Sequence, residues 1–191
     1  VGKTKYVNNL LKNHSFESGV SNWTKDGSGG TCDVSTESAY LGTKSFKIKK
    51  TGDGNLKRFQ RIDINSSYFK VGGTYTFSAY VKTTESNTNS SIYANCFGSS
   101  GSIYCPGSQM INEITDYKRI SVTFTIPANT TYVNFVLSSK GTSGTTYFDC
   151  IQVEEGEVVN DYNLLENSSF DNTSSTVWKG YSNYDDGSYS Q

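Results

Sequence analysis

The sequence predicts an all-β fold, a sandwich or barrel of about eight to ten short strands. Apolar and polar residues alternate with a period of two in several segments, which is typical of half-buried antiparallel strands. Clusters of Gly, Ser and Asn separate these segments and mark turns. Apolar residues are not repeated at the three- and four-residue spacing of an amphipathic helix.

The alternation is clearest in TYTFSAYVK, where Tyr75, Phe77 and Val81 share one face and Ser78 and Tyr80 share the other. The segment around ISVTFTI places alternate apolar residues on one side in the same way. The strands expected from such patterns are residues 44–49, 59–64, 74–82, 91–97, 120–126, 132–138 and 145–153.

Composition and charge exclude several kinds of partner. The formal net charge is −1 and no cluster of Lys and Arg is present, which argues against nucleic acid. The apolar runs are far shorter than the roughly 20 residues needed to cross a bilayer, so membrane insertion is not expected. The first residues lack the apolar stretch of a signal peptide, so an export signal would have to lie upstream.

A short motif occurs twice. NLLKNHSFE at residues 9–17 recurs as NLLENSSFD at residues 163–171, with six of nine positions identical, and Trp23 and Trp178 follow the two copies. The repeat predicts a module over residues 6–157, a linker over 158–162, and the truncated start of a second, similar module over 163–191. Neighbouring modules of the same chain are therefore expected partners.

Several segments resemble the jelly-roll carbohydrate-binding modules of families four, nine, sixteen and twenty-two. They are NLLKNHSFE followed by Trp, GTKSFKIKK, FQRIDI, VGGTYTFSAYVKT, YKRISVTFTIP and TYFDCIQVEEG. The resemblance implies a galactose-binding-like jelly roll of two antiparallel sheets, often with a structural calcium ion and a glycan site. It also implies a secreted or cell-surface protein, bacterial in origin, that binds poly- or oligosaccharides.

The family pattern places calcium ligands after the entry Phe and in the closing strand, which correspond to Glu17 and Asp149. Carbonyl groups of the turn at residues 41–44 would complete the oxygen shell that calcium requires. The alternative is that both acids lie at solvated strand ends. Asp53 and Asp63 are less favoured, because no second acid accompanies either of them.

Glycan binding requires aromatic platforms for the apolar sugar faces and flanking polar groups for the hydroxyls. If Ile62 and Ile64 face the core, Phe59 and Arg61 point away from it. Core packing and ligand contact are both open for Trp23, and edge packing is the alternative for Phe59. The candidate ligand-binding residues are Trp23, Phe59, Arg61, Tyr80 and Arg119, with Tyr93, Phe97 and Tyr104 as a further rim.

The four cysteines suit an exported protein but do not require one. Cys96 and Cys105 bracket a Gly/Ser-rich segment that predicts a hairpin, and a disulfide between them is expected. Cys32 and Cys150 either pair or act as small buried apolar residues. A zinc site is not expected, because there is one histidine and no CxxC spacing.

No nucleophile, metal-protease or phosphate-binding motif is present. The sequence therefore predicts a non-catalytic carbohydrate-binding module of a multimodular exported protein. A structural spacer or protein-adhesion repeat is the main alternative. A small glycoside hydrolase is a third, because two suitably placed carboxylates would suffice for that reaction.

Overall fold

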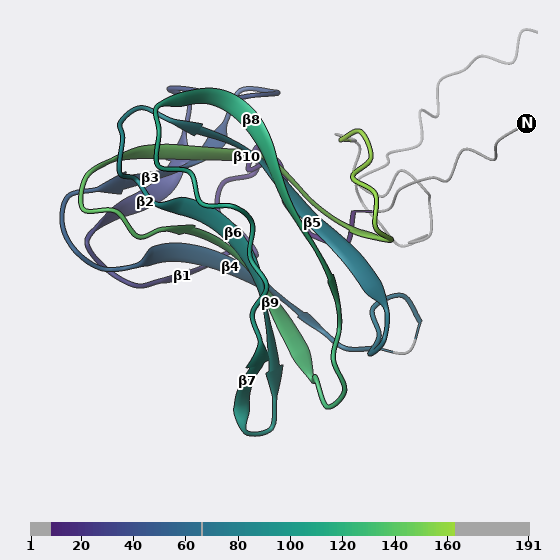
Figure 1. Ribbon diagram of the computed structural model, residues 1–191. Coiled ribbons are helices and arrows are strands. Elements are labelled where there is room, and N and C mark those ends of the chain that lie inside the picture. Colours follow the sequence, from purple (N-terminus) through teal and green to yellow (C-terminus); the bar gives the residue numbers. More distant parts are fainter. Residues whose placement is uncertain (1–8, 66, 163–191) are drawn as a thin grey trace, which may run out of the picture.

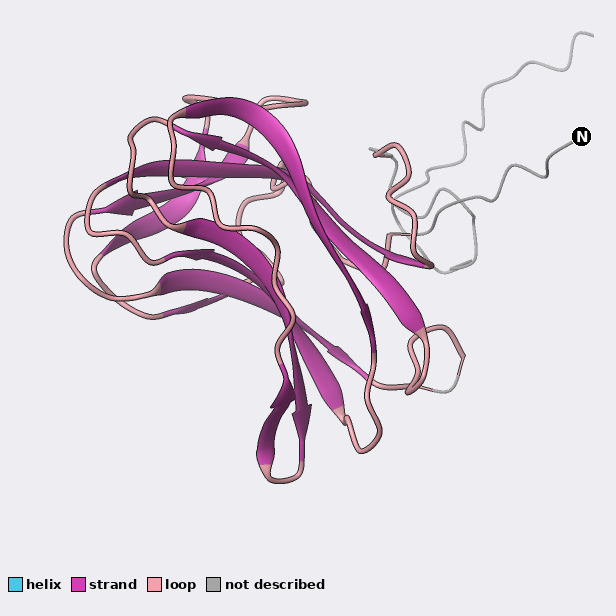
Figure 2. Ribbon diagram, in the orientation of Figure 1, coloured by secondary structure: helices cyan, strands magenta, loops and turns pink. Residues whose placement is uncertain are grey.

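Two antiparallel sheets of five strands each pack face to face in a computed structural model of the chain, which describes residues 9–65 and 67–162 (Figure 1). Sheet A has the strand order β1-β4-β9-β6-β7 and sheet B the order β2-β3-β10-β5-β8. Strands and loops make up the described residues, and no helix able to span a membrane occurs among them (Figure 2).

The strands of sheet A are β1 (Thr24–Asp26), β4 (Leu56–Asp63), β9 (Tyr132–Ser139), β6 (Ser90–Gly98) and β7 (Gly101–Tyr104). Those of sheet B are β2 (Gly30–Ser35), β3 (Ser45–Lys50), β10 (Gly144–Glu155), β5 (Thr74–Thr83) and β8 (Thr115–Thr125).

The core between the sheets is built from the inward side chains of both layers. Phe77 of β5 meets Phe135 of β9 edge to face, with ring centroids 5.2 Å apart. Phe46 of β3 stacks on Phe16 of the entry segment at 5.3 Å. Aromatic pairs in such geometries add stabilisation beyond the burial of their area.

The entry segment, residues 9–23, closes one end of the sandwich against β10. The Leu10 amide donates to the Val153 carbonyl at 2.9 Å, and the Ile151 amide donates to the His14 carbonyl at 3.0 Å. Asn9 bridges the same stretch, because its Nδ2 donates to the Ile151 carbonyl and its Oδ1 accepts from the Val153 amide. A bulge shifts the β10–β5 register between Asp149 and Gln152, so both side chains reach the outer face of sheet B.

The structure confirms the jelly-roll sandwich of two antiparallel sheets, and each expected strand has a counterpart. Two short strands, β1 and β2, were not expected, because neither shows a clear alternation in sequence. The strand β7 is the second arm of the hairpin expected between Cys96 and Cys105. The second copy of the repeat lies outside the described residues. Residues 158–162 contact the module, since Asn160 donates to Glu154 and Tyr162 bonds His14.

Candidate functional site

The outer face of sheet A carries aromatic and amide side chains in parallel rows. The β4–β9–β6 register aligns Phe59 with Val136 and Tyr93, and the next outward row aligns Arg61 with Asn134 and Asn95. A third row aligns Asp63 with Tyr132 and Phe97. We call this surface the sheet A face: Phe59, Arg61, Asp63, Tyr93, Asn95, Phe97, Tyr132, Asn134 and Val136.

One border of the sheet A face is a stacked ladder. The Tyr132 ring lies parallel to Phe97, with centroids 4.9 Å apart and planes 11° apart. The Arg61 guanidinium covers the Tyr132 ring at 3.7 Å from its centroid. Arg61 also forms an ion pair with Asp63 at 2.6 Å, which holds the guanidinium over the ring.

Polar groups of the sheet A face lie between this ladder and the row of Phe59 and Tyr93. The Asn134 Oδ1 atom is buried and accepts no hydrogen bond from the described residues. Its neighbour Asn95 accepts a hydrogen bond from the Ser102 hydroxyl. Burial raises the pKa of Tyr93, so its hydroxyl remains a donor. Aromatic rows flanking amides suit a ligand that has apolar ring faces and many hydroxyls.

The predicted ligand-binding residues lie on two opposite faces. Phe59 and Arg61 point outward from β4, as expected, because Ile62 and Ile64 pack against the core. Tyr80 and Arg119 instead lie on the outer face of sheet B, on the paired strands β5 and β8. One extended site cannot include both pairs.

Trp23 lies in the core, which corrects its assignment as a ligand-binding residue. Its side chain is 4% exposed and packs against Phe16 at 5.2 Å between centroids. The indole Nε1 donates to the Asn13 carbonyl at 3.2 Å. Trp23 thus fixes the entry segment beneath sheet A and presents no ring face to solvent.

Glu17 and Asp149 converge on the turn at residues 40–44. Glu17 Oε1 accepts from the amides of Thr43 and Lys44 at 2.9 and 2.7 Å. Asp149 Oδ2 accepts from the amides of Tyr40 and Leu41 at 2.7 and 3.1 Å. Sequence-distant acids therefore meet at one turn, as the resemblance implied, but the turn directs N–H groups toward both.

Asp149 is buried without a cationic partner among the described residues. Burial raises the pKa of this carboxyl to about 6, against the opposing effect of the hydrogen bonds from Leu41, Cys150 and Tyr40. No group of three or more His, Cys, Asp or Glu side chains positioned to hold a metal occurs within residues 9–65 and 67–162. The two carboxylates are hard oxygen donors from separate elements, as calcium requires. Their oxygens already accept hydrogen bonds from the turn and from Cys150, so calcium would have to displace some of these bonds and take its further ligands from carbonyls or water.

His14 is the second buried ionisable group of interest. Its Nδ1 bonds the Tyr162 hydroxyl, and the ring meets Tyr162 edge to face at 5.3 Å. Burial lowers the pKa of His14 to about 4, because a charged imidazolium would lose its hydration there. His14 thus joins the entry segment to the end of the module.

The predicted Cys96–Cys105 disulfide is absent, and all four cysteines are free thiols. The hairpin is present, but Cys96 pairs across it with Tyr104. Cys105 follows Tyr104 and therefore points to the opposite side of the β6–β7 ribbon. Cys96, Cys32 and Cys150 are buried, as small apolar residues often are.

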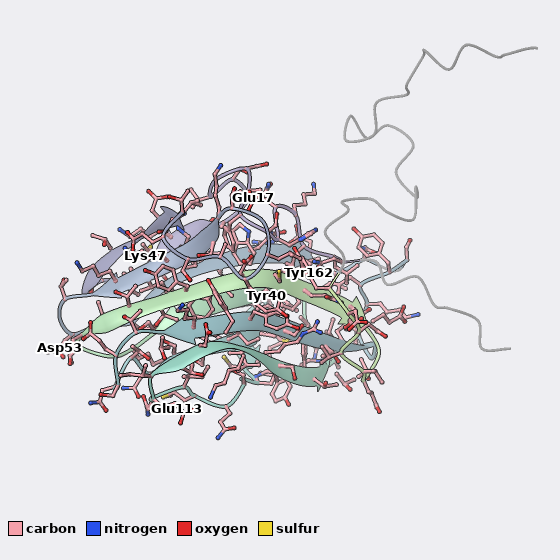
Figure 3. All side chains as sticks on the ribbon, turned by 90° about the horizontal axis from the view of Figure 1, so that it is seen from above. Glu17, Tyr40, Lys47, Asp53, Glu113 and Tyr162 are labelled. Carbon is pink, nitrogen blue, oxygen red and sulfur yellow. The ribbon has the colours of Figure 1, made fainter. Side chains whose placement is uncertain are left out.

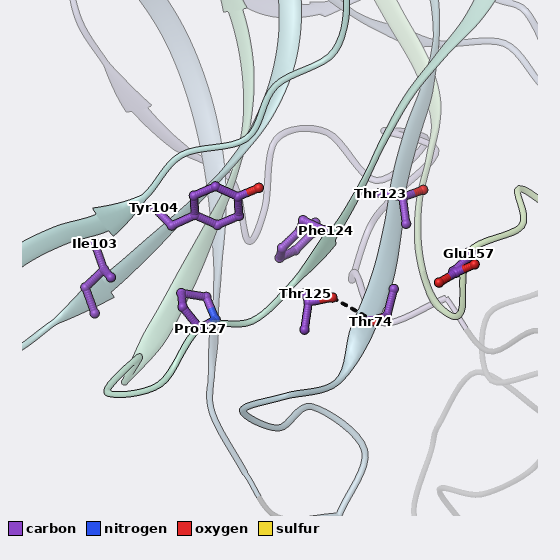
Figure 4. Close-up of a pocket in the computed structure, with 8 residues that line it drawn as sticks. All are labelled: Thr74, Ile103, Tyr104, Thr123, Phe124, Thr125, Pro127 and Glu157. Carbon is purple, nitrogen blue, oxygen red and sulfur yellow. Dashed lines mark hydrogen bonds between the residues drawn. The ribbon is translucent and has the colours of Figure 1, made fainter.

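A pocket of about 580 Å³ lies where β7 and β8, the edge strands of the two sheets, approach each other (Figure 4). Thr74 and Thr125 share a hydrogen bond at its wall, and Tyr104 and Phe124 supply aromatic surface. Of the aromatic residues expected from the sequence, only Tyr104 lines this pocket. The sheet A face lies elsewhere.

Sequence reasoning missed Tyr132, Asn134 and Tyr40. The first two could have been found, because the alternation in YVNFVLSS already places them outward. Tyr40 gave no signal, because it lies in an irregular turn whose position depends on Asp149, which is remote in sequence.

Comparisons with known proteins agree with this architecture. The sequence profile of the carbohydrate binding domain of families four and nine matches residues 8–145. A solved family 16 carbohydrate binding module is 25% identical, with a TM-score of 0.61 over 76% of this chain and 99% of its own. A family 22 module of Clostridium thermocellum Xyn10B is 18% identical, with a TM-score of 0.55 over 82% of this chain and 96% of its own, which shows a shared fold.

The chain is also 29% identical over 177 residues to the tRNA(Glu)-specific nuclease WapA of Bacillus subtilis subsp. natto strain BEST195. That match covers 85% of this chain but 7% of the relative, so the chain spans a small part of that protein. Because the family profile covers most of the sandwich, the chain belongs to the carbohydrate binding domain family of types four and nine.

Proposed function

We propose that this module is non-catalytic and binds a poly- or oligosaccharide on the sheet A face. The observation that carries the proposal is the arrangement of that face, in which Asn95 and Asn134 lie between aromatic rows. The side-chain amides of Asn95 and Asn134 would bind sugar hydroxyls, and the rings would cover apolar sugar faces.

The acids bordering the sheet A face support a binding role over hydrolysis. Asp26 pairs with Lys57 at 3.0 Å and Asp63 pairs with Arg61 at 2.6 Å. The hydrogen bond from Lys57 holds the pKa of Asp26 below its usual value. A glycosidase needs one carboxyl that is protonated before reaction, and a carboxylate paired with a cation is poorly suited to that role. The nuclease activity named for the WapA relatives is not assigned to this segment.

Affinity electrophoresis of the whole chain through gels containing soluble polysaccharides tests the proposal. We expect retardation by at least one glycan. Phe59→Ala should weaken binding about tenfold, because it removes a stacking surface. Tyr132→Ala should weaken it by a similar factor, because it removes the ring that holds Phe97 and Arg61 in the ladder. Tyr68→Ala is the matched control, since it removes an equally large ring that is 56% exposed and lies in the β4–β5 loop.

Unchanged mobility of the folded protein across neutral and acidic polysaccharides would instead favour the spacer or adhesion function. Retardation that Phe59→Ala and Tyr132→Ala leave intact would reject the sheet A face as the site. Circular dichroism of each variant confirms that the fold is retained.

We also propose that Glu17 and Asp149 hold a structural calcium ion. It would supply no reaction chemistry and would tie the entry segment, the turn at 40–44 and β10 together. The burial of Asp149 without a cation supports this, since a divalent ion would compensate its charge.

Calcium in excess should therefore raise the free energy of unfolding, and with it the melting temperature, relative to chelator. An ion that binds only the folded protein adds about 2.7 kcal/mol to the free energy of unfolding when its concentration is 100 times the dissociation constant. Glu17→Gln should abolish the response. Asp53→Asn should keep it, because Asp53 is an acid of another loop that makes no contact with Glu17 or Asp149 in the described structure. Identical melting curves with calcium and with chelator would show that Glu17 and Asp149 do not hold a stabilising calcium ion.

The finer context is also a proposal: a secreted or cell-surface multimodular protein in which this module neighbours others like it. The repeated NLLxNxSF motif supports tandem modules, and the length of the WapA relatives supports a long parent chain. Tandem copies would raise the avidity of a weak single site.

A further inference from the structure

The outer face of sheet B carries a second cluster of aromatic rings, away from the sheet A face. Figure 3 looks onto this side, where Tyr40 lies over the middle of the sheet. The Tyr40 ring stacks on Tyr80 with centroids 3.7 Å apart and planes 12° apart. Tyr117 meets Tyr40 at 5.6 Å and 61°, so the two rings form a corner. We call Tyr40, Tyr80, Tyr117, Arg119 and Lys82 the tyrosine face.

The stack leaves one ring of the tyrosine face accessible. Tyr40 is 44% exposed although one side of its ring is covered by Tyr80. Its backbone amide is held by Asp149, so the turn that carries the ring is fixed before any ligand arrives. A fixed aromatic surface loses little conformational entropy on binding.

Arg119 gives the tyrosine face a positive charge without a matching acid. Its guanidinium lies 5.5 Å from the Tyr80 ring, and Nη2 donates to Ser78 Oγ and Gln152 Oε1 at 3.1 and 3.2 Å. Both acceptors are neutral. The Nε atom is buried and has no hydrogen-bond partner in residues 9–65 and 67–162, and no carboxylate within that part of the chain forms an ion pair with Arg119.

The acids near Arg119 are already engaged. Asp149, two strands away in the same row, accepts hydrogen bonds from backbone amides. Glu154 accepts from the amide and side chain of Asn160. Two lysines of the same outer face, Lys47 and Lys82, pair with Glu37 and Asp116. Lys49 forms no ion pair among the described residues, but it is exposed to solvent.

We infer that the tyrosine face is a second saccharide site and that it takes an acidic sugar residue. The sugar ring packs on Tyr40 in the corner formed with Tyr117, and its carboxylate accepts hydrogen bonds from Arg119. Charge complementarity selects this occupant, since a carboxylate supplies the counter-charge that Arg119 lacks. With the sheet A face on the opposite side, the module then links two glycan chains.

Calorimetric titration of the whole chain with oligogalacturonate, oligomannuronate and hyaluronan oligosaccharides tests the inference. We expect weak binding of at least one of them at low salt. Arg119→Gln and Tyr40→Ala should each weaken it about tenfold or more, because each removes one of the two main contacts. Methyl-esterified oligogalacturonate, which has the same ring without the charge, should not bind at this site.

Lys49→Gln is the matched control, because it removes one positive charge from an exposed position on β3 of the same sheet. It should leave the affinity unchanged. Phe59→Ala and Tyr132→Ala should also leave it unchanged, since they alter the sheet A face only. Melting curves of Arg119→Gln and Tyr40→Ala establish that each variant is folded.

The inference is overturned if the folded chain binds none of the three acidic oligosaccharides, or if Arg119→Gln binds them as well as the parent. Equal affinity for the methyl ester would also overturn it. Loss of acidic-sugar binding in Phe59→Ala would show that the acidic sugar binds on the sheet A face, and that the module has one glycan site. Failure of the sheet A face to bind any glycan does not affect these outcomes.

Discussion

Replacing Trp23 by alanine is expected to lower the free energy of unfolding by about 3–5 kcal/mol, the usual range for removing a buried aromatic side chain. The indole fills space beside Phe16 and its Nε1 donates to the Asn13 carbonyl, so the substitution leaves a cavity and removes one of the two hydrogen bonds that this oxygen accepts. A domain of ordinary stability has about 5–15 kcal/mol to lose. Denaturant unfolding followed by far-ultraviolet circular dichroism measures the change.

Trp23→Phe is the companion variant, because it keeps an aromatic ring in the core and loses the hydrogen bond. It should lose much less stability than the alanine variant. Glycan affinity, measured where each variant is folded, should stay at the level of the parent. A stable Trp23→Ala protein that no longer binds glycan would show that the indole contacts the ligand and would contradict its placement in the core.

Acid should destabilise the module through His14. Its pKa is about 4 in the folded protein and 6.5 in its reference state, so the unfolded chain binds the proton more tightly. Burying the neutral His14 therefore contributes stability that is fully present above pH 6.5 and is lost as the pH falls toward 4. The loss amounts to about 3 kcal/mol at pH 4.

His14→Asn is the variant that isolates this effect, because its side-chain amide reaches the position of Nδ1 and can still bond the Tyr162 hydroxyl. Unfolding free energies of both proteins are measured between about pH 7 and pH 4. The parent should lose about 3 kcal/mol more than the variant over that range. Asp149, whose carboxyl pKa burial raises to about 6, titrates in both proteins and cancels in the difference. Parallel stability curves would show that His14 is protonated without cost.

The strands and the outward direction of Phe59 and Arg61 could be predicted, because alternation along a strand is a local property of the chain. The convergence of Glu17 and Asp149 on one turn was also anticipated, since it follows from a motif shared with the family. Alternation alone does not reveal which sheet a strand joins. Phe59 and Tyr80 both point outward, and only the long-range pairing of β4 with β9 and of β5 with β10 places them on opposite sides.

The role of Trp23 could not be read from its motif for a similar reason. The residue follows the entry segment in sequence, but its burial depends on Phe16 and on the strands that close over both rings. The Cys96–Cys105 pairing failed on a register difference of one residue, which turns a side chain to the other face of a ribbon. A Gly/Ser-rich segment predicts that a hairpin forms, but it does not predict which residues of the two strands pair.

The hydrogen bonds that join residues 9–14 to 151–162 also determine how the module carries mechanical load. The chain enters and leaves the sandwich at one end, where Leu10 bonds Val153 and His14 bonds Tyr162 (Figure 1). A pulling force applied along the chain therefore passes across these few contacts and does not shear the two sheets. In a tandem chain of the kind proposed, the module would hang beside the stretched chain, and the load would reach the contacts of the entry segment before it reached the sheet A face.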